Sequence, residues 1–582
     1  MKITSCFLCL FCSTALLSQI PVFPGAQGFG TTITTGGRGG QVIYVTNLDC
    51  DGPGSLNQAL ATPGPKYILF KVSGIIDCAA WVEWGDCYVA GQTSPGGITV
   101  RGIYIDDWYD PNGGAQNIVL RHLNSRPNTE DIRPATGWVL DDGLRLDGAS
   151  RVVVDHCTFA NAIDEQVQIS RSNNITIQHC MLAESVGDHY MFGGMLLNYS
   201  AEGHHKDSIS IHHNIWNRLG GRMPEITCEQ SGEAPNDVSC LQHPLRLELS
   251  NNVFWDQQIE TYYNSGFYTS GQEEHGLQLH ANIVNNRSVV RSTYCNAMFR
   301  ILMLNFADNI LFANGNTMSR YPTYHDYDLF YCCNDFCDAN NNPNTEMGLA
   351  QRRVARFPFP NIDYTPTAQL VTTVAATVGA FNCYSAGHRD QMNRRLLQPL
   401  QSQLIDNHPI DGTDYFHDAY SLDFVSPPAA PIDTDGDGMP NDWEIAEGLN
   451  PNLADHNGTQ RSVALTGIAG YTNLECYLNQ LSDQLVHGNC GAVATLEPSA
   501  GYPAASVNFD GATHSLQVSI AGGFGPTGPW QVSMHNTTGV LLCKAVLQTP
   551  EGIVPIPTCP AGVYFVTLSQ GNIVETKRVY IP

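Results

Sequence analysis

The sequence has few positively charged residues for its length. Its 582 residues contain 29 Lys and Arg against 55 Asp and Glu, so the formal net charge is −26. A chain with this balance has no long-range positive field to attract a polyanion, which argues against binding to nucleic acid or to an anionic membrane. Any acidic substrate would have to be held by local cations.

A hydrophobic run long enough to span a membrane is also missing. The apolar run of residues 6–17 follows a lysine, is too short to cross a bilayer, and is followed by small and polar residues. We therefore expect residues 1–18 to be a secretory signal peptide. The mature chain is then expected outside the cell, either free or attached to the cell surface, with no membrane-inserted segment.

Charged residues and helical patterns are sparse, whereas turn-forming residues are plentiful. Only 14% of the residues are charged, and 54 Gly and 33 Pro are spread along the chain without a collagen-like period. This composition favours many short strands joined by turns. Hydrophobic residues make up 42% of the chain, which is enough for a large core. We expect an all-β main domain with smaller attachments.

The cysteine count fits an oxidising compartment. Three of the 19 cysteines lie in the expected signal peptide, and an even number remains. Cys228 and Cys240, and likewise Cys78 and Cys87, are close enough in the sequence to form loop disulfides.

One short pattern recurs between residues 116 and 314: an alternating apolar run, a polar residue or Asn, a second short run and a turn. Examples are "VVVDHCTFAN", "ITIQHCMLAES" and "SISIHHNIWNR". Cys157 and Cys180 occupy equivalent places in successive copies, and each is expected to be a buried free thiol. A period in the twenties with Asn at the corners predicts a parallel β-helix, in which each repeat is one coil. A β-sandwich also has many short strands, but it would not repeat the same corner residue.

The composition changes near residue 426, where a Pro/Ala-rich linker is followed by the acidic run "DTDGDGMPNDWE". The run fits the calcium-loop pattern D-x-D-x-D-G-x5-E, in which carboxylates surround the ion and the glycine permits a sharp turn. Residues 426–490 are thus expected to form an EF-hand-like calcium-binding segment with short helices, and a solvated acidic loop is the alternative. The expected ligands of this structural calcium are Asp433, Asp435, Asp437, Met439, Asn441 and Glu444.

The last part of the chain, residues 495–582, is expected to form a compact β-sandwich, because several alternating runs are separated by turns. Its end contains "GVYFV" at residues 562–566 and the final strand "ETKRVYIP". These features resemble the C-terminal sorting domains of proteins exported by the Bacteroidetes type IX secretion system, which implies the secretion machinery as a partner. An ordinary accessory β-domain is the alternative.

Several motifs along residues 22–480 resemble one family. They include "PVFPGAQGFG" near the start, "DDGLRLDGASRVVVDHCTF", "SISIHHN" and "GRMP" in the repeats, and "DTDGDGMPNDWEIAEGLNPN" near the end. In this order they resemble secreted pectate lyases of polysaccharide lyase family 1. The resemblance implies a right-handed parallel β-helix over residues 19–425, a monomer, and calcium-assisted β-elimination on polygalacturonate or another acidic plant or algal polysaccharide.

The resemblance also implies an active-site calcium. Asp142 stands where the family has a calcium-binding Asp, and Asp164 stands at another ligand position one coil later. The family's next acid is replaced by Gln168, whose carbonyl oxygen can still coordinate but carries no charge, so calcium binding should be weaker. Glu165 could compensate if the turn redirects it, with Asp141 as a further second-rank ligand. The alternative is that these acids only cap solenoid turns.

Arg222 in "GGRMP" matches the family arginine that is assigned as the base in proton removal. A guanidinium holds its proton strongly, so chemistry alone would make Arg222 a cation that stabilises the developing negative charge. Nearby calcium ions would disfavour the protonated form and make the family role admissible. A surface arginine fixed by Pro224 is the alternative.

Two cations of the family are missing. The second arginine is replaced near Thr227, and Arg246 is the expected substitute that could reach the cleft. A substrate-binding lysine is also absent, and His189 is the expected replacement, able to hydrogen-bond substrate or to carry charge at lower pH. The histidines that recur at strand positions are expected to be structural, namely His156, His212 and His213.

Two other functions stay open. A polygalacturonase-like β-helix hydrolase would need an acid and a base carboxylate on either side of the bond, and "DDG" at residues 141–143 could supply part of that pair. A noncatalytic carbohydrate-binding or adhesive β-helix would explain the missing cations and acid, but not the retained Arg222. Ultraviolet absorbance separates the three, since only elimination makes a conjugated double bond.

Overall fold

The computed structural model describes most of the chain. The described residues are 20–106, 114, 116–127, 142–186, 193–228, 240–256, 261–263, 277–290, 299–301, 310–332, 352–405, 418–426, 428–488 and, with short gaps, 505–581. The expected signal peptide of residues 1–18 lies outside the described residues.

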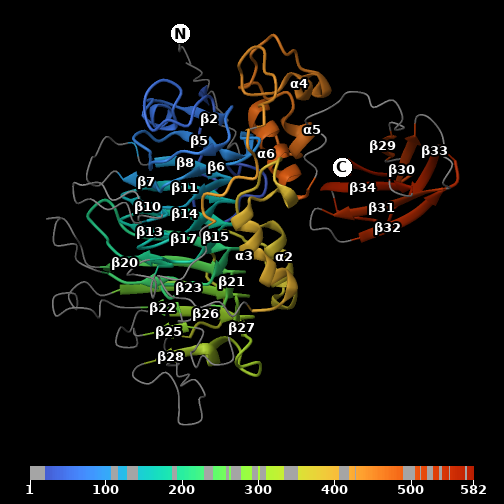
Figure 1. Cartoon of the computed structure of the whole chain (residues 1–582). Coiled ribbons are helices and arrows are strands. Elements are labelled where there is room, and N and C mark those ends of the chain that lie inside the picture. Colours follow the sequence, from blue (N-terminus) through green and yellow to red (C-terminus); the bar gives the residue numbers. More distant parts are fainter. Residues whose placement is uncertain are drawn as a thin grey trace, which may run out of the picture.

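Three parallel sheets, named A, B and C here, wind around one long core (Figure 1). Each coil contributes a strand to sheet C, then to sheet A, then to sheet B, and every strand pairs in parallel with its counterpart in the next coil. This topology confirms the predicted parallel β-helix. The strands of sheet A are β1 (Gln41–Val45), β2 (Lys66–Phe70), β5 (Cys87–Ala90), β8 (Gln116–Arg121), β11 (Ser150–Asp155), β14 (Asn173–Gln178), β17 (Asp207–His212), β20 (Cys240–Ser250), β23 (Leu277–Val284) and β26 (Ile310–Asn314).

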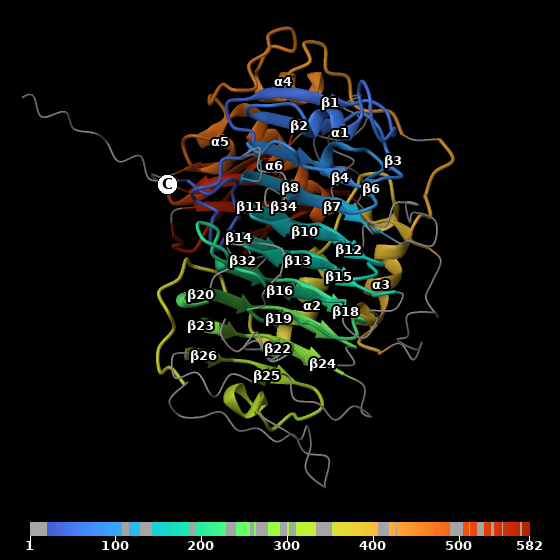
Figure 2. The same cartoon turned by 90° about the vertical axis from the view of Figure 1, so that its left-hand side faces the viewer.

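Sheets B and C complete the coils, and sheet C faces the viewer in Figure 2. Sheet B consists of β3 (Gly74–Ile75), β6 (Ile98–Val100), β9 (Leu123–Ser125), β12 (Thr158–Ala160), β15 (Met181–Ala183), β18 (Ile215–Asn217), β21 (Val253–Trp255), β24 (Arg287–Val289) and β27 (Thr317–Met318). Sheet C consists of β4 (Ala80–Trp81), β7 (Ile103–Asp106), β10 (Leu144–Asp147), β13 (Val167–Ser170), β16 (Met195–Leu197), β19 (Glu225–Ile226), β22 (Thr261–Tyr263), β25 (Phe299–Ile301) and β28 (Phe330–Cys332).

Alternation within each strand decides which side chains enter the core. In β10, Leu144 and Leu146 are fully buried in the core cluster, whereas the side chain of Arg145 between them is 27% exposed on the outer face. In β13, Val167 and Ile169 enter the same core. Branched apolar side chains stacked coil upon coil thus form one continuous core along the solenoid.

A ladder of buried asparagines joins successive coils where sheet A turns into sheet B. The side-chain Nδ2 of each member donates to Oδ1 of the next, at 3.1, 3.1 and 3.0 Å. Because every amide is buried and bonded to its neighbours, a coil that slipped out of register would leave polar groups without partners. The members are Asn214, Asn252, Asn286 and Asn316.

Two cysteines hold the same corner in the coils before the asparagine ladder. The backbone N–H of Cys180 donates to Oδ1 of Asn214 at 2.8 Å, and the N–H of Cys157 lies 3.4 Å from Sγ of Cys180. Both thiols are buried and free, as predicted. Their equivalent places in the sequence repeat therefore reflect equivalent places in successive coils.

The residue just before this corner position is a histidine in four coils, and the four rings form a buried histidine stack. Adjacent ring centroids lie 5.1, 4.9 and 5.1 Å apart, and each of these residues has a positive φ. Burial lowers the pKa of His179 to about 3 and that of the neighbouring His212 to about 4. The members of the stack are His122, His156, His179 and His213.

One predicted disulfide is confirmed and one is wrong. Cys228 pairs with Cys240, as expected, but Cys78 pairs with Cys50 and not with Cys87. Cys87 lies in β5 as a fully buried free thiol of the core. Burial raises the pKa of the Cys87 thiol to about 12, which keeps it protonated and unreactive.

The chain after the last coil returns along the solenoid and covers it with helices (Figure 1). Helices α2 and α3 pack on sheet B, where Val374 and Leu396 share a cluster with Trp255. The helices are α1 (Leu56–Leu60), α2 (Thr367–Thr377), α3 (Gln391–Ser402), α4 (Asn441–Glu447), α5 (Ser462–Thr466) and α6 (Asn473–Val486), with 3-10 turns η1 (Gly91–Thr93), η4 (Asp326–Leu329) and η6 (Ala386–His388). Among the described residues, no helix has both the length and the apolarity that crossing a membrane requires.

Helix α6 closes the structure against the first coils. It begins with a capping box, in which Thr472 and Glu475 bond each other's backbone, and Glu475 also pairs with Arg38 at 2.9 Å. Its apolar side packs with Tyr67 and Tyr88 of sheet A. The segment expected to bind calcium therefore contains helices α4, α5 and α6 and shares a core with the N-terminal coils.

The C-terminal part consists of two antiparallel sheets with a common core, as predicted. One sheet has the strand order β29-β30-β33 and the other β32-β31-β34-β35. The strands are β29 (Ala505–Asp510), β30 (Ser515–Ile520), β31 (Trp530–Asn536), β32 (Leu541–Leu547), β33 (Glu551–Pro555), β34 (Gly562–Gln570) and β35 (Ile573–Ile581).

The histidine stack generates a prediction for acid stability. Between about pH 6.5 and pH 3, an unfolded chain protonates its histidines while the folded chain holds His179 neutral, so the unfolded state binds more protons. The free energy of unfolding is therefore expected to fall as the pH drops through this window, as measured by urea unfolding at about pH 7 and about pH 4.

The control is His179→Asn, since Asn251 and Asn285 hold the same corner in later coils. This variant is expected to lose less stability between the two pH values than the parent chain. An equal loss in both would contradict a contribution from the stack.

Candidate active site

Three acids gather where successive coils enter sheet C. Asp142 lies just before β10, and Asp164 and Glu165 lie just before β13, the neighbouring strand. One side-chain oxygen of each acid lies within 4.8 Å of the others. The register produces this arrangement, because Leu144 pairs with Val167 and so sets Asp142 beside Glu165. These three residues are called the acid cluster below.

The members of the acid cluster differ in their exposure. Asp142 and Glu165 are buried, at 3% and 1% exposed, and the backbone N–H of Glu165 donates to Oδ1 of Asp142 at 3.1 Å. The side chain of Asp164 is 34% exposed. The cluster thus has two fixed acids at its base and one that solvent or a ligand can reach.

Arg222 comes from a later coil and lies against the acid cluster. It precedes β19, with a φ of 54°, in the left-handed region. Its Nε donates to Oε2 of Glu225 at 2.8 Å, and its Nη1 donates to Oε1 of Glu165 and lies 3.8 Å from Oδ1 of Asp164. The structure therefore brings together four of the residues that the sequence singled out.

Gln168 lies on β13 close to these acids, with its side chain on the outer face. It is 6% exposed, and its Nε2 donates to Oγ of Ser170 at 3.1 Å. The residue opposite it on β10 is Arg145, whose guanidinium lies 3.8 Å from Oδ2 of Asp142 and 3.7 Å from Oδ2 of Asp147.

Sequence reasoning missed Arg145 as a candidate cation. Its signal was the alternation in "GLRLDG", which places Arg145 between two core leucines and three residues after Asp142. In a strand, that pattern sends the side chain to the face opposite the core.

Of the predicted substrate-binding residues, Arg246 is described and does not lie at the acid cluster. Arg246 lies on β20 in sheet A, where its Nε donates to Asp207 at 3.0 Å and its guanidinium stands 5.9 Å from the ring centre of Phe29. Both His189 and the second-rank ligand Asp141 lie outside the described residues.

The histidines expected to be structural lie on the side of sheet A, away from the acid cluster. His156 and His213 belong to the buried histidine stack, and the Nε2 of His212 lies 3.1 Å from the carbonyl oxygen of Gln27. Asp155 at the same side pairs with Arg121 at 2.7 Å. These contacts fasten the N-terminal segment and the corner to sheet A.

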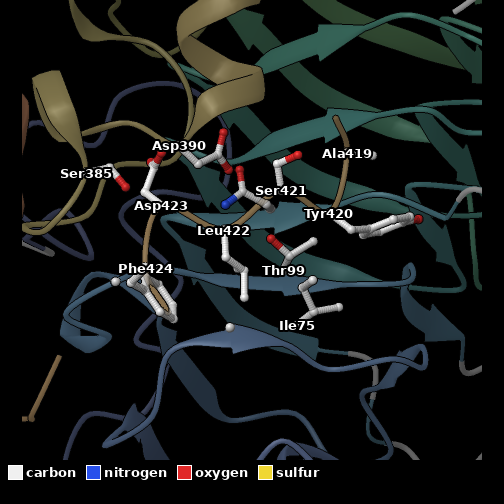
Figure 3. Close-up of a pocket in the computed structure, with 14 residues that line it drawn as sticks. Ile75, Thr99, Ser385, Asp390, Ala419, Tyr420, Ser421, Leu422, Asp423 and Phe424 are labelled. Atoms are coloured by element: carbon white, nitrogen blue, oxygen red, sulfur yellow. The ribbon is translucent and has the colours of Figure 1, made fainter. Parts of the chain in front are cut away.

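A small pocket on the side of sheet B is separate from these residues (Figure 3). It lies between Ile75 and Thr99 of sheet B and the returning segment with Tyr420, Leu422 and Phe424. No member of the acid cluster lines it. It is a packing gap under the returning chain rather than a cleft for a polymer.

A second group of acids lies in the loop before α4. Side-chain oxygens of Asp433, Asp435 and Asp437 lie within 4.8 Å of one another. Glu444 is fully buried beside them, and neither of its side-chain oxygens has a hydrogen-bond partner among the described residues. Burial and the neighbouring carboxylates raise the pKa of Glu444 to about 8. Buried acids arranged in this way fit a bound cation.

The other predicted ligands of this loop have local partners. Met439 is buried, and its backbone N–H donates to Oδ1 of Asp437 at 3.1 Å. The side chain of Asn441 bonds Thr434, accepting from its N–H at 2.8 Å. The loop is fastened to the solenoid through Tyr44 of β1, whose hydroxyl donates to Asp433.

Comparison with known proteins gives relatives of one kind. A probable pectate lyase C from Emericella nidulans is 28% identical over 476 residues, which cover 81% of this chain and 94% of the relative. A probable pectate lyase C from Aspergillus terreus is 26% identical over 482 residues, which cover 81% of this chain and 96% of the relative. No family model matches the sequence.

Two solved structures match at low overall similarity. The cedar pollen allergen Jun a 1 is 14% identical with a TM-score of 0.36, covering 60% of this chain and 90% of the allergen. The pectate lyase pelN from Paenibacillus sp. 0602 is 11% identical with a TM-score of 0.33, covering 64% of this chain and 98% of the other. These scores carry no argument about function. The fungal matches show that, over four fifths of its length, the chain is related in sequence to pectate lyases.

Proposed function

We propose that this chain is a secreted polysaccharide lyase that cleaves polygalacturonate by calcium-assisted β-elimination. The observation that carries the proposal is the acid cluster with Arg222 set against it, in a chain related over most of its length to proteins named probable pectate lyases. The acids supply ligands for a cation, and Arg222 supplies a positive group in contact with them.

β-Elimination removes a proton from the carbon beside a uronate carboxylate and expels the glycosidic oxygen, which leaves a double bond at the new non-reducing end. The carbon acid is weak, so the negative charge that develops towards the carboxylate must be stabilised. Calcium bound at the acid cluster would supply that stabilisation by neutralising the carboxylate. The residues of the chain must hold the substrate in place and either accept the proton or stabilise the negative charge that its removal creates.

The acid cluster fits calcium by its chemistry, because carboxylate oxygens are the ligands that this ion prefers. Asp142 and Asp164 would hold the ion. The carboxylate of Glu165 pairs with Arg222, and it would also lie among the ligands of the ion. Gln168 adds a polar side chain without charge, so we infer weaker calcium binding than a further carboxylate at this position would give.

The contacts and exposure of Arg222 support the proposal that it acts on the substrate. Its side chain is 19% exposed, and Glu225 and Glu165 bond its guanidinium from two sides. These contacts hold a positive group that remains partly open to solvent, so the surroundings of Arg222 support a role in stabilising the developing charge.

The wider setting belongs to the same proposal. We infer that the protein acts outside the cell on pectin or a similar acidic polysaccharide, and that its C-terminal sheets act in export. The acidic loop before α4 is proposed to bind a second, structural calcium, because the unpaired oxygens of the buried Glu444 face a group of acids. One observation favours the noncatalytic alternative: Gln168 stands where the family that the sequence resembles has an acid.

The first prediction concerns the reaction. With calcium and polygalacturonate, the protein is expected to produce a rise in ultraviolet absorbance from unsaturated uronate, and a chelator is expected to abolish it. Arg222→Ala should lower the rate by about 10²- to 10⁴-fold, because either role of the guanidinium is lost. Arg246→Ala, on sheet A, is the matched control and should retain the parent rate.

The possible outcomes separate the alternatives. New reducing ends without absorbance would indicate a hydrolase, and binding without either product would indicate the noncatalytic function. A full rate in Arg222→Ala would remove this residue from the mechanism.

A second prediction concerns Gln168. Gln168→Asp restores a negative charge beside the acid cluster, so the calcium concentration that gives half-maximal activity should fall by roughly tenfold. The control is Gln168→Asn, which shortens the side chain without adding charge. A calcium titration of the lyase rate measures both, and equal titrations in the two variants would argue against a charge effect.

A third prediction concerns the loop before α4. Chelation should lower the thermal unfolding temperature of the parent chain, and Glu444→Gln should lower it by roughly 5 °C in the presence of calcium, because a ligand is lost from the folded state. Asp442→Asn lies on the exposed side of the same helix and serves as the control. If the two variants unfold at the same temperature in calcium, the loop does not bind the ion.

A further inference from the structure

The outer face of sheet C carries one continuous row of side chains beside the acid cluster. The row takes one residue from each of six successive strands of the sheet, and each member lies directly opposite the next in the parallel register. The row consists of Trp81, Tyr104, Arg145, Gln168, Leu196 and Glu225.

Alternation shows that the N-terminal half of this row points away from the core. Ala80 and Val82 on either side of Trp81 belong to the core cluster, and so do Ile103 and Ile105 on either side of Tyr104. The side chains between them must therefore face outwards.

Trp81 is an exposed aromatic ring with a fixed support. It is 43% exposed, and its ring stacks on that of Tyr104, with centroids 4.7 Å apart and an interplanar angle of 26°. Its backbone N–H donates to Oδ1 of Asn57 at 3.0 Å, and Tyr104 itself is 5% exposed. A ring held from beneath in this way loses little freedom when something binds its open side.

Arg145 is the cation next to this aromatic pair. It lies opposite Tyr104 on one side and Gln168 on the other, and its side chain is 27% exposed. Its guanidinium lies between Asp142 and Asp147, at 3.8 and 3.7 Å. A carboxylate bound at the acid cluster would therefore lie within reach of this positive group.

We propose that Trp81, Tyr104 and Arg145 form additional substrate-binding subsites that extend the acid cluster along sheet C towards the N-terminal coils. This inference rests on the proposed function and identifies the substrate as a uronate chain several residues long. Arg145 binds the carboxylate of one uronate, and Trp81 stacks on the ring of another further along the chain.

The chemistry of the row matches such a chain. A polyuronate alternates apolar ring faces with carboxylates, whereas the row offers an indole face and then a guanidinium, which binds carboxylates with two parallel hydrogen bonds. Strands in a sheet lie about 4.8 Å apart, so Trp81 is about 14 Å from Gln168, a span that only a substrate of several sugar units can fill.

The experiment compares substrates of increasing length. For the parent chain, kcat/KM should rise as oligogalacturonates lengthen from the trimer. Trp81→Ala should remove the gain on long substrates, a loss of about tenfold, and leave the rate on the shortest one unchanged. Trp81→Phe should keep most of the gain, since a flat ring remains.

Arg145→Gln should raise KM for polygalacturonate by about ten- to hundredfold, because a charge-assisted hydrogen bond is lost. The rise should be smaller on methyl-esterified pectin, whose carboxylates are neutral. The controls are Arg246→Gln on sheet A and Tyr384→Ala, an exposed aromatic ring that lies outside the row.

Binding without turnover separates this inference from the proposed reaction. In an Arg222→Ala background, affinity electrophoresis in gels containing polygalacturonate should show retardation that is reduced by Trp81→Ala and by Arg145→Gln. Equal losses of activity at every substrate length, or unchanged retardation in both variants, would overturn the subsites whether or not the parent chain is a lyase.

Discussion

Each coil of the solenoid is fixed to the next at one buried corner, and the rest of the structure depends on that contact. The asparagine amides bond one another from coil to coil, and the residue before each of them has a left-handed backbone. A one-residue slip would turn every core side chain outwards and leave these amides without partners. The corner thus sets the register of sheet C as well, and the register alone brings Asp142 beside Glu165, although 23 residues separate them along the chain.

Much of this architecture could be predicted because it repeats. Cys157 and Cys180 revealed the coil period, and Asp142, Asp164 and Arg222 lie together where the motifs indicated. Features that depend on one particular contact could not be read from the repeat. Cys78 bonds Cys50, whereas Cys87 is a free thiol buried in the core, and nearness in the sequence does not reveal which cysteine the fold brings close. The packing of α6 on the first coils joins residues about four hundred positions apart, for which no local pattern exists.

Described arginines of the coils fall into two groups by their exposure. Several arginines are committed to buried ion pairs, such as Arg171 with Asp147 and Arg121 with Asp155, each at 2.7 Å and with side chains at most 3% exposed. Such pairs satisfy charges inside the protein and offer nothing to a ligand. Arg145 and Arg222 are different, because both contact acids near the cluster and keep part of the side chain in solvent. Both belong to the strip of sheet C on which we propose that the polysaccharide binds.

The return of the chain to its own beginning has a consequence for the order of events during synthesis. Tyr67, Tyr88 and Val119 of the first coils are buried together with Leu474 and Leu478 of α6. Until that helix emerges, these early side chains lack their cover, and the outer face of the first coils is an apolar surface. The solenoid therefore cannot be completed progressively from its N-terminus as the ribosome delivers it. Its first coils reach their final packing only after the described coil strands through β28 have been made, so the nascent chain remains an incomplete structure for most of its translation.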